Sequence, residues 1–520
     1  MRSRSGLFDA SVTVYFFFLL VFLISRTSNF TSPHDSMAYL EMLRTKNHLW
    51  HPHHLLYHEL SYYWLQLWKG IFPRVDDYLL VESLSCVFGA GTIAIVFRFF
   101  RNRFDLPLLT SWVATGIVAF SYGVWFYSIN VEVYAPSIFF TIACLYQLTK
   151  KEWEAKAVWL TVIFHSLAIL FHQMNILMAP VVIYKIFEQR KNIFVFKTIF
   201  WYAFSGIVLV GGTYLLAGRV GEGHYDFKSW MQWLEGYTAT NEYWRPLTLK
   251  TPFLAATGFG HAIIGGHFIF NMGLDKLFSS LLGAHSLSDE YFLVKNMPKG
   301  IGISLFILCV LFVIGTLVLL IKFISRFKSI NKQYFYITVP LILYIVVYSV
   351  YFLFWMPEIL EFWIGQSIAF WLLLIGTYEP VNRRFNLLLT SMLVLLVAVN
   401  YGGSIRPMQN INNDIGYVRV QKVREMATSS DLVVVQDPWL LKEFLEYYTP
   451  ATIVTSPTDQ PQNDSLQTEI RNRLQQGHKI FVFPDPKTGG NNDFTHTLIN
   501  EYNGRSTVIQ KDPAEVYMIK

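Results

Sequence analysis

The feature that most constrains this chain is a succession of long apolar stretches. Stretches of about 17 to 25 residues, the length that crosses a bilayer, begin near Asp9, Leu79, Pro107, Val133, Phe194, Gly300, Phe335, Glu361 and Asn386. A further apolar run, residues 157–184, is too long for one helix and is interrupted by His172, Gln173 and Asn175, so we divide it into two short helices. The pattern predicts an α-helical polytopic membrane protein with about eleven transmembrane helices.

Composition agrees with a membrane protein, because 53% of the residues are hydrophobic and only 15% are charged. The net charge of +6 does not require an anionic partner, since Lys and Arg gather at the cytoplasmic ends of membrane helices in any case. We therefore predict membrane lipids and no nucleic acid among the partners. The three cysteines all lie in apolar stretches, which offers no disulfide framework or cysteine metal site. The first apolar stretch follows Arg2 and Arg4 without a small-residue cleavage site after it, and we interpret it as a retained helix.

The distribution of Lys and Arg predicts the orientation. With the N-terminus in the cytoplasm, every short basic loop falls on the inner side; these loops contain Arg98, Arg101 and Arg103, Lys150, Lys151 and Lys156, Lys185, Arg190, Lys191 and Lys197, Lys322, Arg326, Lys328 and Lys332, and Arg383 and Arg384. The first outer loop is then 25–78, and a second outer region spans 218–299. Within that region, residues 253–274 are apolar but interrupted by Gly and His, so we expect an interfacial or re-entrant helix there.

The chain changes character after Asn400, and we divide it into a membrane domain, 1–403, and a C-terminal domain, 404–520. Four segments, DLVVVQD, TIVTS, KIFVFPD and STVIQ, have the pattern of short buried strands, and PWLLKEFLEYY and SLQTEIRNRLQQG between them have the pattern of helices. Alternation of strands and helices predicts a small α/β domain. Because the N-terminus is predicted to be cytoplasmic and the number of crossings is odd, we expect this domain outside the cytoplasm. It has no GxGxxG and no GxxxxGK[ST], the motifs that would indicate nucleotide binding.

Polar side chains that interrupt or flank membrane helices are functional candidates. The predicted topology places Asp35, the histidines of 48–58, Glu132, His172, Arg245, Glu358 and Glu361 at one outer face. Asp35 directly precedes a helix pattern, so it is either an N-cap, or a functional acid, or both. His51, His54 and His58 are spaced to share one helix face, with Pro52 near the helix start. Such a face could hold a divalent metal or a phosphate. We favour phosphate, because no HExxH and no cysteine accompanies the group.

The other candidates also have two interpretations each. Glu132 is either a solvated residue at a helix end or a second acid of the site. His172 and Asn175 either hydrogen-bond between helices or line a cavity. Arg245 could pair with a phosphate through its planar fork of donors, and it lies in an aromatic-rich outer segment that could equally be an interfacial anchor. Glu358 stands with Glu361 at the mouth of a predicted crossing.

Four short motifs, in order along the first half of the membrane region, resemble those of the C-type superfamily of integral-membrane glycosyltransferases. They are HDS at 34–36, HPHHLLY at 51–57, NVEVYAPS at 130–137 and FHQMN at 171–175. Within the superfamily the chain is most similar to the bacterial protein O-mannosyltransferase-like membrane proteins, whose first outer loop contains GDS and then HPPGYPLY. The chain departs from them where Pro52, His53 and His54 replace PPG. In the protein mannosyltransferases a second acid directly follows the first, whereas here Asp35 is followed by Ser36. These departures leave the acceptor and any metal dependence open.

The resemblance implies transfer of a sugar, with inversion, from a polyprenyl-phosphate donor to a protein, lipid or glycan acceptor at the outer face of a membrane. For the family it resembles, that is the bacterial inner membrane. We assign Asp35 as general base and Glu132 as a second acid that orients the acceptor or helps to shape the site. His51, His54 and Arg245 would bind the donor phosphate. His53, His172, Asn175 and Glu358 would line the cavity or contact the acceptor. No cofactor is required by this assignment, although a divalent metal stays open.

Two other classes of function compete with this one. A transporter or flippase for a lipid-linked or anionic solute would explain the polar break at His172, because discontinuous helices are typical of transporters. Clustering of the acids at one face and the lack of an inverted repeat weigh against it. A receptor whose C-terminal domain binds a partner would need only a membrane anchor, and about eleven crossings exceed that need.

Overall fold

The computed structural model describes residues 5–191, 193–236, 243–272, 280, 288–436, 440–456, 460–484 and 494–520. It divides into two compact units. The first, here called the membrane unit, comprises Met1–Arg26 and Lys46–Pro407. The second, the α/β unit, comprises Thr27–Thr45 and Met408–Lys520. The division near Pro407 lies close to the change in composition, whereas the assignment of Thr27–Thr45 to the α/β unit has no counterpart in the sequence analysis.

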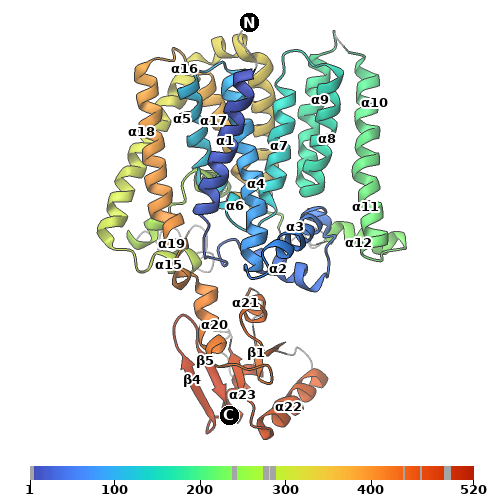
Figure 1. Ribbon diagram of the computed structural model, residues 1–520, viewed down its shortest axis with the longest axis vertical. Coiled ribbons are helices and arrows are strands. Elements are labelled where there is room, and N and C mark those ends of the chain that lie inside the picture. The colour runs from blue at the N-terminus through green and yellow to red at the C-terminus, as the bar shows by residue number, and fades with distance from the viewer. Residues whose placement is uncertain are drawn as a thin grey trace. The chain divides into compact units, whose positions relative to one another are not determined.

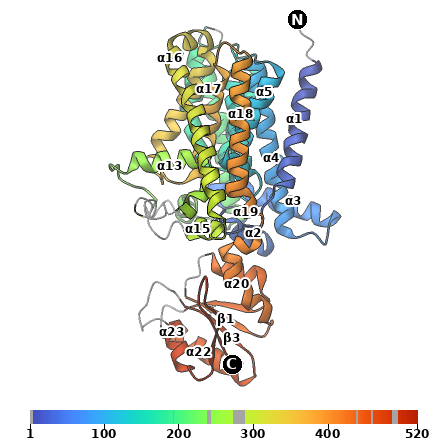
Figure 2. The ribbon, with the colours of Figure 1, turned by 90° about the vertical axis from the view of Figure 1, so that its left-hand side faces the viewer.

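Helices make up the described part of the membrane unit, and they stand side by side in Figures 1 and 2. Their bounds are α1 (Ser5–Ile24), η1 (Pro52–His54), α3 (Tyr57–Ile71), α4 (Asp77–Arg98), η2 (Phe99–Arg103), α5 (Leu108–Ala119), α6 (Tyr122–Ser128), α7 (Tyr134–Leu148), α8 (Ala155–Phe171), η3 (Gln173–Met178), α9 (Ala179–Glu188), α10 (Val195–Gly206), η4 (Ile207–Gly211), α11 (Gly212–Leu216), η5 (Ala217–Gly221), α12 (Phe227–Glu235), α13 (Thr251–Ile263), η7 (His267–Met272), α15 (Ser288–Val294), α16 (Lys299–Phe352), η9 (Leu360–Trp363), α17 (Ile364–Gly376), α18 (Arg383–Asn400) and η10 (Tyr401–Ile405). The short α19 (Arg406–Met408) lies at the division between the units.

Five helical stretches of the described residues are long and apolar enough to cross a membrane: 77–103, 195–221, 299–330, 333–352 and 383–408. A sixth results if α5 and α6, which meet at an angle of 73°, form one bent span. Four shorter apolar helices accompany them, at Ala10–Ile24, Tyr134–Leu148, Ala155–Phe171 and Leu360–Gly376. Helices thus begin close to every predicted start, and the predicted break at His172 separates α8 from α9. The total of about eleven crossings stays a prediction.

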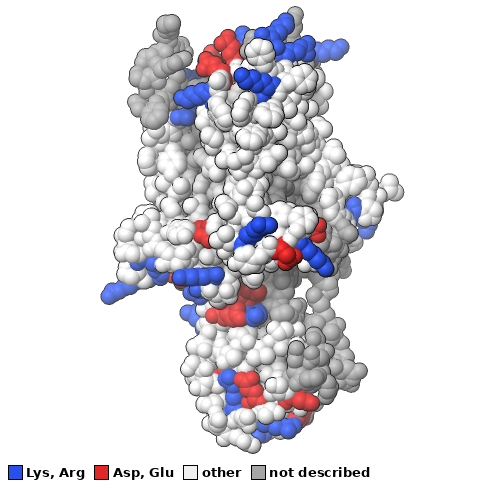
Figure 3. Space-filling view, turned by 90° about the vertical axis from the view of Figure 1, so that its right-hand side faces the viewer, with Lys and Arg blue, Asp and Glu red and all other residues white. Residues whose placement is uncertain are grey.

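Packing in the membrane unit follows the chain, since α4 lies against α1 and α7, and α7 lies against α8. Small residues permit the close approach that membrane helices need: a methyl group added at Gly89 of α4 would come within 2.2 Å of the Ser128 hydroxyl. Long α16 bends at Tyr334, whose backbone angles are not helical. Most of the apolar surface of α10 and of the first half of α16 is exposed, and the face seen in Figure 3 shows a broad zone with few charges. Such a surface suits lipid.

Several of the basic loops predicted to share one side do contact each other. An Arg103 guanidinium N–H donates to the Tyr146 carbonyl at 2.9 Å, at the C-terminal end of α7. The Lys185 ammonium donates to the Lys150 carbonyl at 2.7 Å, and Phe104 packs on Tyr334 with ring centroids 5.8 Å apart. These contacts define a basic end of the membrane unit. Which side of a membrane this end faces stays a prediction.

The α/β unit is built on a five-stranded sheet of order β2-β1-β3-β5-β4. Strands β1 (Leu432–Val435), β2 (Thr452–Thr455) and β3 (Ile480–Phe483) are parallel, whereas β4 (Ser506–Gln510) and β5 (Val516–Ile519) pair antiparallel. The accompanying helices are α2 (Ser36–Thr45), η11 (Ile411–Asn413), α20 (Ile415–Met426), α21 (Leu441–Tyr448), α22 (Gln460–Gln475) and α23 (Phe494–Glu501). The four predicted strands and two predicted helices are present; β5, α20 and α23 were not predicted.

Buried side chains of β1 and β3 form the core of this unit together with one face of α22. Leu432, Val434, Ile480 and Val482 face Leu466, Ile470 and Leu474. Strands β1 and β3 are buried along their whole length, as their continuous apolar runs predict, whereas the edge strand β2 is partly exposed. Burying these side chains at about 25 cal/mol per Å² supplies the main driving force for folding of the unit.

Candidate functional site: a buried histidine, tyrosine and acid cluster

Four histidines of the first loop lie together in the membrane unit. His51 has an extended backbone and precedes η1, with Pro52 in the first helical position. Its ring lies 5.5 Å from that of His53, 5.5 Å from that of His54, on which it stacks, and 6.0 Å from that of His58. His53, His54 and His58 are buried. The structure therefore brings the histidines together across two short helices, η1 and α3, and not along one helix face as their spacing predicts.

Apolar and aromatic packing fixes this loop. Leu55 packs with Leu170, Tyr214 and Ala217. The Leu56 amide donates to the Leu170 carbonyl at 3.1 Å, and the Tyr214 hydroxyl donates to the Pro52 carbonyl at 2.6 Å. The loop is thereby tied to the end of α8 and to α11.

His54 connects the histidines to the break between α8 and α9. Its ring lies 4.7 Å from the ring of His172, edge to face. The His172 ring lies 5.4 Å from that of Tyr134, the first residue of α7. Tyr134 and Tyr127 donate to the carboxylate of Glu361 at 3.0 Å and 2.6 Å. One continuous polar group thus runs from His51 to Glu361.

Glu132 belongs to the same group. It lies between α6 and α7 and is only 2% exposed. Burial raises the pKa of the Tyr57 hydroxyl, and the nearby charge of Glu132 raises it further. Tyr57 opens α3, directly before His58. The structure thereby excludes the interpretation of Glu132 as a solvated helix end. We name the set His51, His53, His54, His58, His172, Tyr57, Tyr127, Tyr134, Glu132 and Glu361 the polar cluster.

The polar cluster and the basic end lie at opposite ends of α7, because Tyr134 begins that helix and Tyr146 lies near its end. At 1.5 Å per residue, the rise of α7 from Tyr134 to Tyr146 separates them by about 18 Å. A buried group of histidines and acids at the end remote from the basic loops is the arrangement that the sequence predicts for an outer site.

Loss of hydration keeps the histidines neutral. Burial lowers the pKa of His51 and of His53 to about 4 each and that of His58 to about 3. Burial and the neighbouring imidazoles lower the pKa of His54 well below its ordinary value. A neutral imidazole offers one N–H donor and one acceptor. The Nδ1 atom of His51 is buried without a hydrogen-bond partner among the described residues, so it is available to a ligand.

Asn175 has a structural role in the break. Its side-chain amide donates to the Ser137 hydroxyl at 2.8 Å and to the Ala168 carbonyl at 3.0 Å. Its side-chain oxygen accepts from Thr141 at 2.9 Å and from Tyr348 at 3.0 Å. These bonds join α7, α8 and α16 and satisfy a polar residue that would otherwise be buried unpaired.

Arg245 and Glu358 form an ion pair of their own. Arg245 Nη1 lies 2.5 Å from Glu358 Oε1, and a one-residue β-bridge joins Trp244 to Trp355 beside it. Within the described residues, neither of these two side chains contacts a histidine of the first loop. Because Glu358 neutralises Arg245, an incoming phosphate would compete with that carboxylate.

Asp35 lies in the α/β unit, and the histidines lie in the membrane unit. Its backbone occupies the N-cap position of α2, where the Asp35 carbonyl accepts from the Tyr39 amide at 2.9 Å. Its carboxylate instead accepts from the Tyr39 hydroxyl at 3.2 Å. The side chain reaches solvent, yet loss of hydration to the surrounding protein raises the pKa of Asp35. The carboxylate therefore contacts a side chain of α2, and it is more basic than that of an ordinary aspartate.

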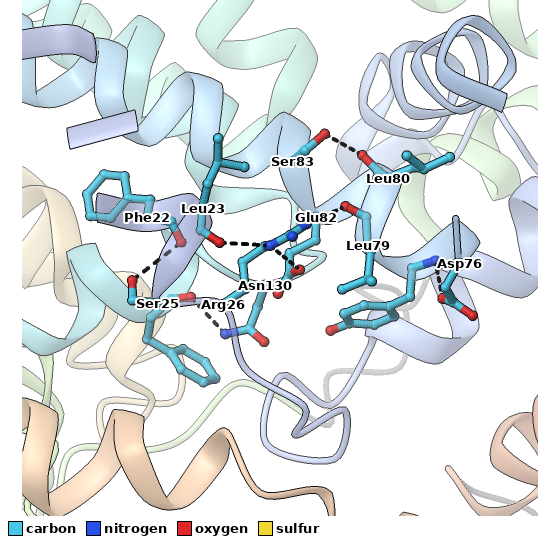
Figure 4. Close-up of polar contacts among 12 residues, drawn as sticks. Phe22, Leu23, Ser25, Arg26, Asp76, Leu79, Leu80, Glu82, Ser83 and Asn130 are labelled. Carbon is cyan, nitrogen blue, oxygen red and sulfur yellow. Dashed lines mark hydrogen bonds and ion pairs between the residues drawn. The ribbon is translucent and has the colours of Figure 1, made fainter. Parts of the chain in front are cut away.

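The sequence analysis assigned no role to Tyr57, Tyr127, Arg26 or Glu82. Glu82 of α4 is fully buried, and Arg26 Nε lies 3.6 Å from Glu82 Oε2. Figure 4 shows the guanidinium lying between Glu82 and the carbonyls of Leu23 and Leu79, to which it donates at 3.1 Å each. An acid inside an apolar stretch was the signal that could have identified this pair. The tyrosines carry no such signal, because aromatic residues are abundant throughout the chain.

Two further observations concern metal binding and the location of a hollow. Among the described residues, no group of three or more His, Cys, Asp or Glu side chains is arranged to hold a metal ion. A hollow of about 520 Å³ lies between α1, α4, α7 and α8, lined by Ser11, Tyr15, Arg98, Phe139, Tyr146 and Phe164 among others. Since Arg98 and Tyr146 line it, this hollow lies toward the basic end and not at the polar cluster.

Solved structures share this fold over nearly the whole chain. It is similar to the crystal structure of ArnT from Cupriavidus metallidurans bound to undecaprenyl phosphate and to the apo form of that protein, each with a TM-score of 0.58, 9% sequence identity, and coverage of 99% of this chain and 98% of ArnT. The oligosaccharyltransferase of Archaeoglobus fulgidus, crystallised with zinc and sulfate, gives a TM-score of 0.46 at 10% identity over 90% of this chain and 68% of that one.

Residues 70–193 match the family model described as the protein O-mannosyl-transferase TMEM260 N-terminal domain. The matched region contains Glu132, His172 and Asn175, so it includes two of the four motifs that carry the predicted resemblance. No curated protein matches the chain in sequence. The resemblance to membrane glycosyltransferases of the O-mannosyltransferase kind is confirmed by the family model and the fold together.

Proposed function

We propose that the protein is an inverting membrane glycosyltransferase that moves a sugar from a polyprenyl-phosphate donor to a protein, lipid or glycan acceptor. The observation that carries the proposal is the buried polar cluster at the end of α7 remote from the basic loops. Similarity over nearly the whole chain to a protein crystallised with undecaprenyl phosphate supports a lipid-linked donor. The sugar transferred in the proposal is a hexosyl or pentosyl group. The match of residues 70–193 to a protein O-mannosyl-transferase model supports a hexosyl group and protein among the acceptor classes.

The proposal includes a membrane arrangement. The chain crosses a bacterial inner membrane about eleven times with its N-terminus in the cytoplasm. The polar cluster and the C-terminal α/β domain then face away from the cytoplasm. The exposed apolar surfaces of α10 and α16 support lipid contact there.

In the reaction, an acceptor oxygen attacks the anomeric carbon of the sugar. A new bond forms between that oxygen and carbon, the bond from the carbon to the phosphate oxygen breaks, and its electron pair leaves with the polyprenyl phosphate. The acceptor's proton passes to the Asp35 carboxylate as general base. The raised pKa of Asp35 suits this role, because a more basic carboxylate accepts a proton more readily.

The leaving phosphate needs hydrogen-bond donors, and His51 and His54 supply them in the proposal. Each is neutral in the absence of a ligand, so each brings one N–H donor. A phosphate beside them favours the protonated imidazole, which adds charge to the hydrogen bonds. Arg245 contributes when the phosphate displaces Glu358 from it.

Glu132 is the second acid of the proposal and orients the acceptor, with Tyr57 as its neighbour. His53 and His172 line the same cavity, and Asn175 holds the helices that form it. Glu358 acts through its ion pair with Arg245. Each step uses the chain's own residues, and no step requires a divalent metal.

The test is substitution of the base. Asp35→Asn keeps the size of the side chain and removes its basicity, so the transfer rate in proteoliposomes supplied with polyprenyl-phosphate sugar should fall by about 100-fold or more. Asp464→Asn, at an exposed acid on α22, is the matched control and should transfer at the wild-type rate. Transfer by the normally folded Asp35→Asn protein at near wild-type rate would remove Asp35 from the mechanism.

Transport of a lipid-linked or anionic solute is the second candidate function, favoured by the polar break between α8 and α9. His172 there has an extended backbone with φ −161° and ψ 116°. Flux of labelled donor across the bilayer in the absence of any acceptor would support this function. Label that moves only when an acceptor is present would contradict it.

A further inference from the structure

The segment that carries Asp35 belongs to the α/β unit, although more than 360 residues separate it from the rest of that unit. Thr27–Thr45 and Met408–Lys520 form one compact unit. The Ser28 amide donates to the Met408 carbonyl at 2.9 Å, at the start of the second part. A first loop held this way is built into the C-terminal domain.

One buried acid, Asp414, makes several of the polar contacts between the two parts of the unit. It is 0% exposed. Its Oδ2 accepts from the Phe30 amide at 2.5 Å and from the Thr31 amide at 3.2 Å, and its Oδ1 accepts from the Thr31 hydroxyl. Asp414 is also the N-cap of α20, because the Tyr417 amide donates to Oδ1 at 3.1 Å. The same carboxylate therefore starts a helix of the α/β domain and holds the first loop.

Thr31, in the first loop, makes two hydrogen bonds through its hydroxyl to the C-terminal part of the unit. Its hydroxyl donates to Asp414 and accepts from the Gly416 amide at 3.0 Å. The approach is close enough that a methyl group added at Gly416 would come within 2.6 Å of the Thr31 hydroxyl. A hydroxyl is required here as both donor and acceptor, and Ser could supply it while Ala could not.

A second contact joins α2 to α21. The Arg44 guanidinium lies 4.3 Å above the ring of Tyr447, and Phe30 packs near Tyr448 with ring centroids 6.4 Å apart. Met37, Leu40 and Leu43 of α2 are buried. Glu443 in the first turn of α21 lies near Asp35: burial raises its pKa, and the charge of Asp35 raises it further. The loop and helix on both sides of Asp35 are therefore fixed to the α/β domain.

We propose that the C-terminal α/β domain is a positioning part of the transferase, acting through the Asp414–Thr31 connection that fixes the loop bearing Asp35. The inference rests on the proposed function, because it concerns the residue assigned there as base. Asp414 and Thr31 are positioning residues in this proposal, since they act through Asp35. A general base displaced by about 1 Å can lose about 100-fold in rate.

Two substitutions at Thr31 test the proposal in the full-length protein in proteoliposomes. Thr31→Ala removes both hydrogen bonds of the hydroxyl, and Thr31→Ser keeps them. We expect Thr31→Ala to lower kcat by about 10-fold to 100-fold with the donor KM unchanged, and Thr31→Ser to restore kcat to within about threefold of wild type. Hydrogen exchange should show faster exchange of the Phe30 and Thr31 amides in the Ala variant, with β1 and β3 still protected.

Asp431→Asn separates positioning from general damage to the domain. Asp431 is also buried and accepts from the Lys479 amide at 2.8 Å and the Thr428 amide at 2.7 Å, all within the C-terminal part of the chain. It should lower the stability of the domain and leave kcat of the folded protein near the wild-type value. Equal kcat for Thr31→Ala and wild type, or equal loss for Asp431→Asn and Thr31→Ala, would overturn the inference. Absence of transfer by the wild-type protein would instead overturn the proposed function.

Discussion

Among single residues, Glu82 is an acid buried within an apolar stretch of the membrane unit. It is fully buried in α4 and its charge is balanced by Arg26 at 3.6 Å. Removing Arg26 would leave a buried charge uncompensated, so Arg26→Met should lower the free energy of unfolding by about 3 to 5 kcal/mol. The double variant Arg26→Met with Glu82→Leu should recover much of that loss. Thermal unfolding in detergent measures both.

The matched control for this ion pair lies on the protein surface. Lys422 and Glu425 are 2.9 Å apart, with side chains 47% and 48% exposed. Exposed ion pairs contribute little to stability, so Lys422→Met should leave the unfolding temperature almost unchanged. A loss as large as that of Arg26→Met would contradict the importance given to burial.

The candidate residues could be named from the sequence where their chemistry is unusual for their surroundings. Glu132 and His172 interrupt apolar stretches, and the structure places both in the polar cluster. The ion pair of Arg245 could not be predicted in this way. Its partner Glu358 lies far along the chain, and a sequence gives no sign of that pairing. The hydroxyls of Tyr57 and Tyr127 lie near buried acids, and a tyrosine with such a neighbour looks like any other tyrosine in a sequence.

Among the elements, the break between α8 and α9 depends on Asn175. Asn175→Leu would remove the amide and leave Thr141, Ser137 and Tyr348 without their bonds to it. Buried groups left unsatisfied cost about 1 to 3 kcal/mol each, so the unfolding free energy should fall by several kcal/mol. Asn386→Leu, which removes a single bond from Thr110, is the control and should cost less. Equal losses in thermal unfolding would show that the break is not held by Asn175.

Helices were easier to predict than strands, for a physical reason. A membrane helix is specified by the length of one apolar stretch, and helices begin near each predicted start. Strand β5 depends on pairing with β3 and β4, which its four residues alone do not indicate. The predicted helix after Asp35 exists as α2, but its attachment to the α/β unit rests on contacts between residues far apart in sequence. No local pattern records such contacts.

For the whole molecule, the neutral histidines predict a pH dependence of stability. The pKa values of His51 and His53 are lowered to about 4, and that of His58 to about 3, from an ordinary value of 6.5. Protonation therefore favours the unfolded state, so their contribution is complete above pH 6.5 and is lost as pH falls toward 4. At pH 5 the loss is about 2 kcal/mol for each of these histidines.

The measurement is the unfolding temperature of the full-length protein in detergent between pH 7.5 and pH 5. It should fall with pH, and His58→Gln should flatten the fall. His478→Gln, on the α/β unit and outside the polar cluster, should leave the slope as in the wild type. A His58→Gln protein with the wild-type slope would contradict the burial of an uncharged imidazole.

The proposed chemistry is tested most directly by following label and lipid together. Purified protein in proteoliposomes receives polyprenyl phosphate carrying a labelled sugar, with an acceptor extract of membranes and periplasmic protein. We predict that label joins the acceptor, that free polyprenyl phosphate appears in equal amount, and that the new bond has the anomeric configuration opposite to that of the donor. Label that crosses the bilayer with its bond to the lipid phosphate intact, and no labelled acceptor, would contradict the account.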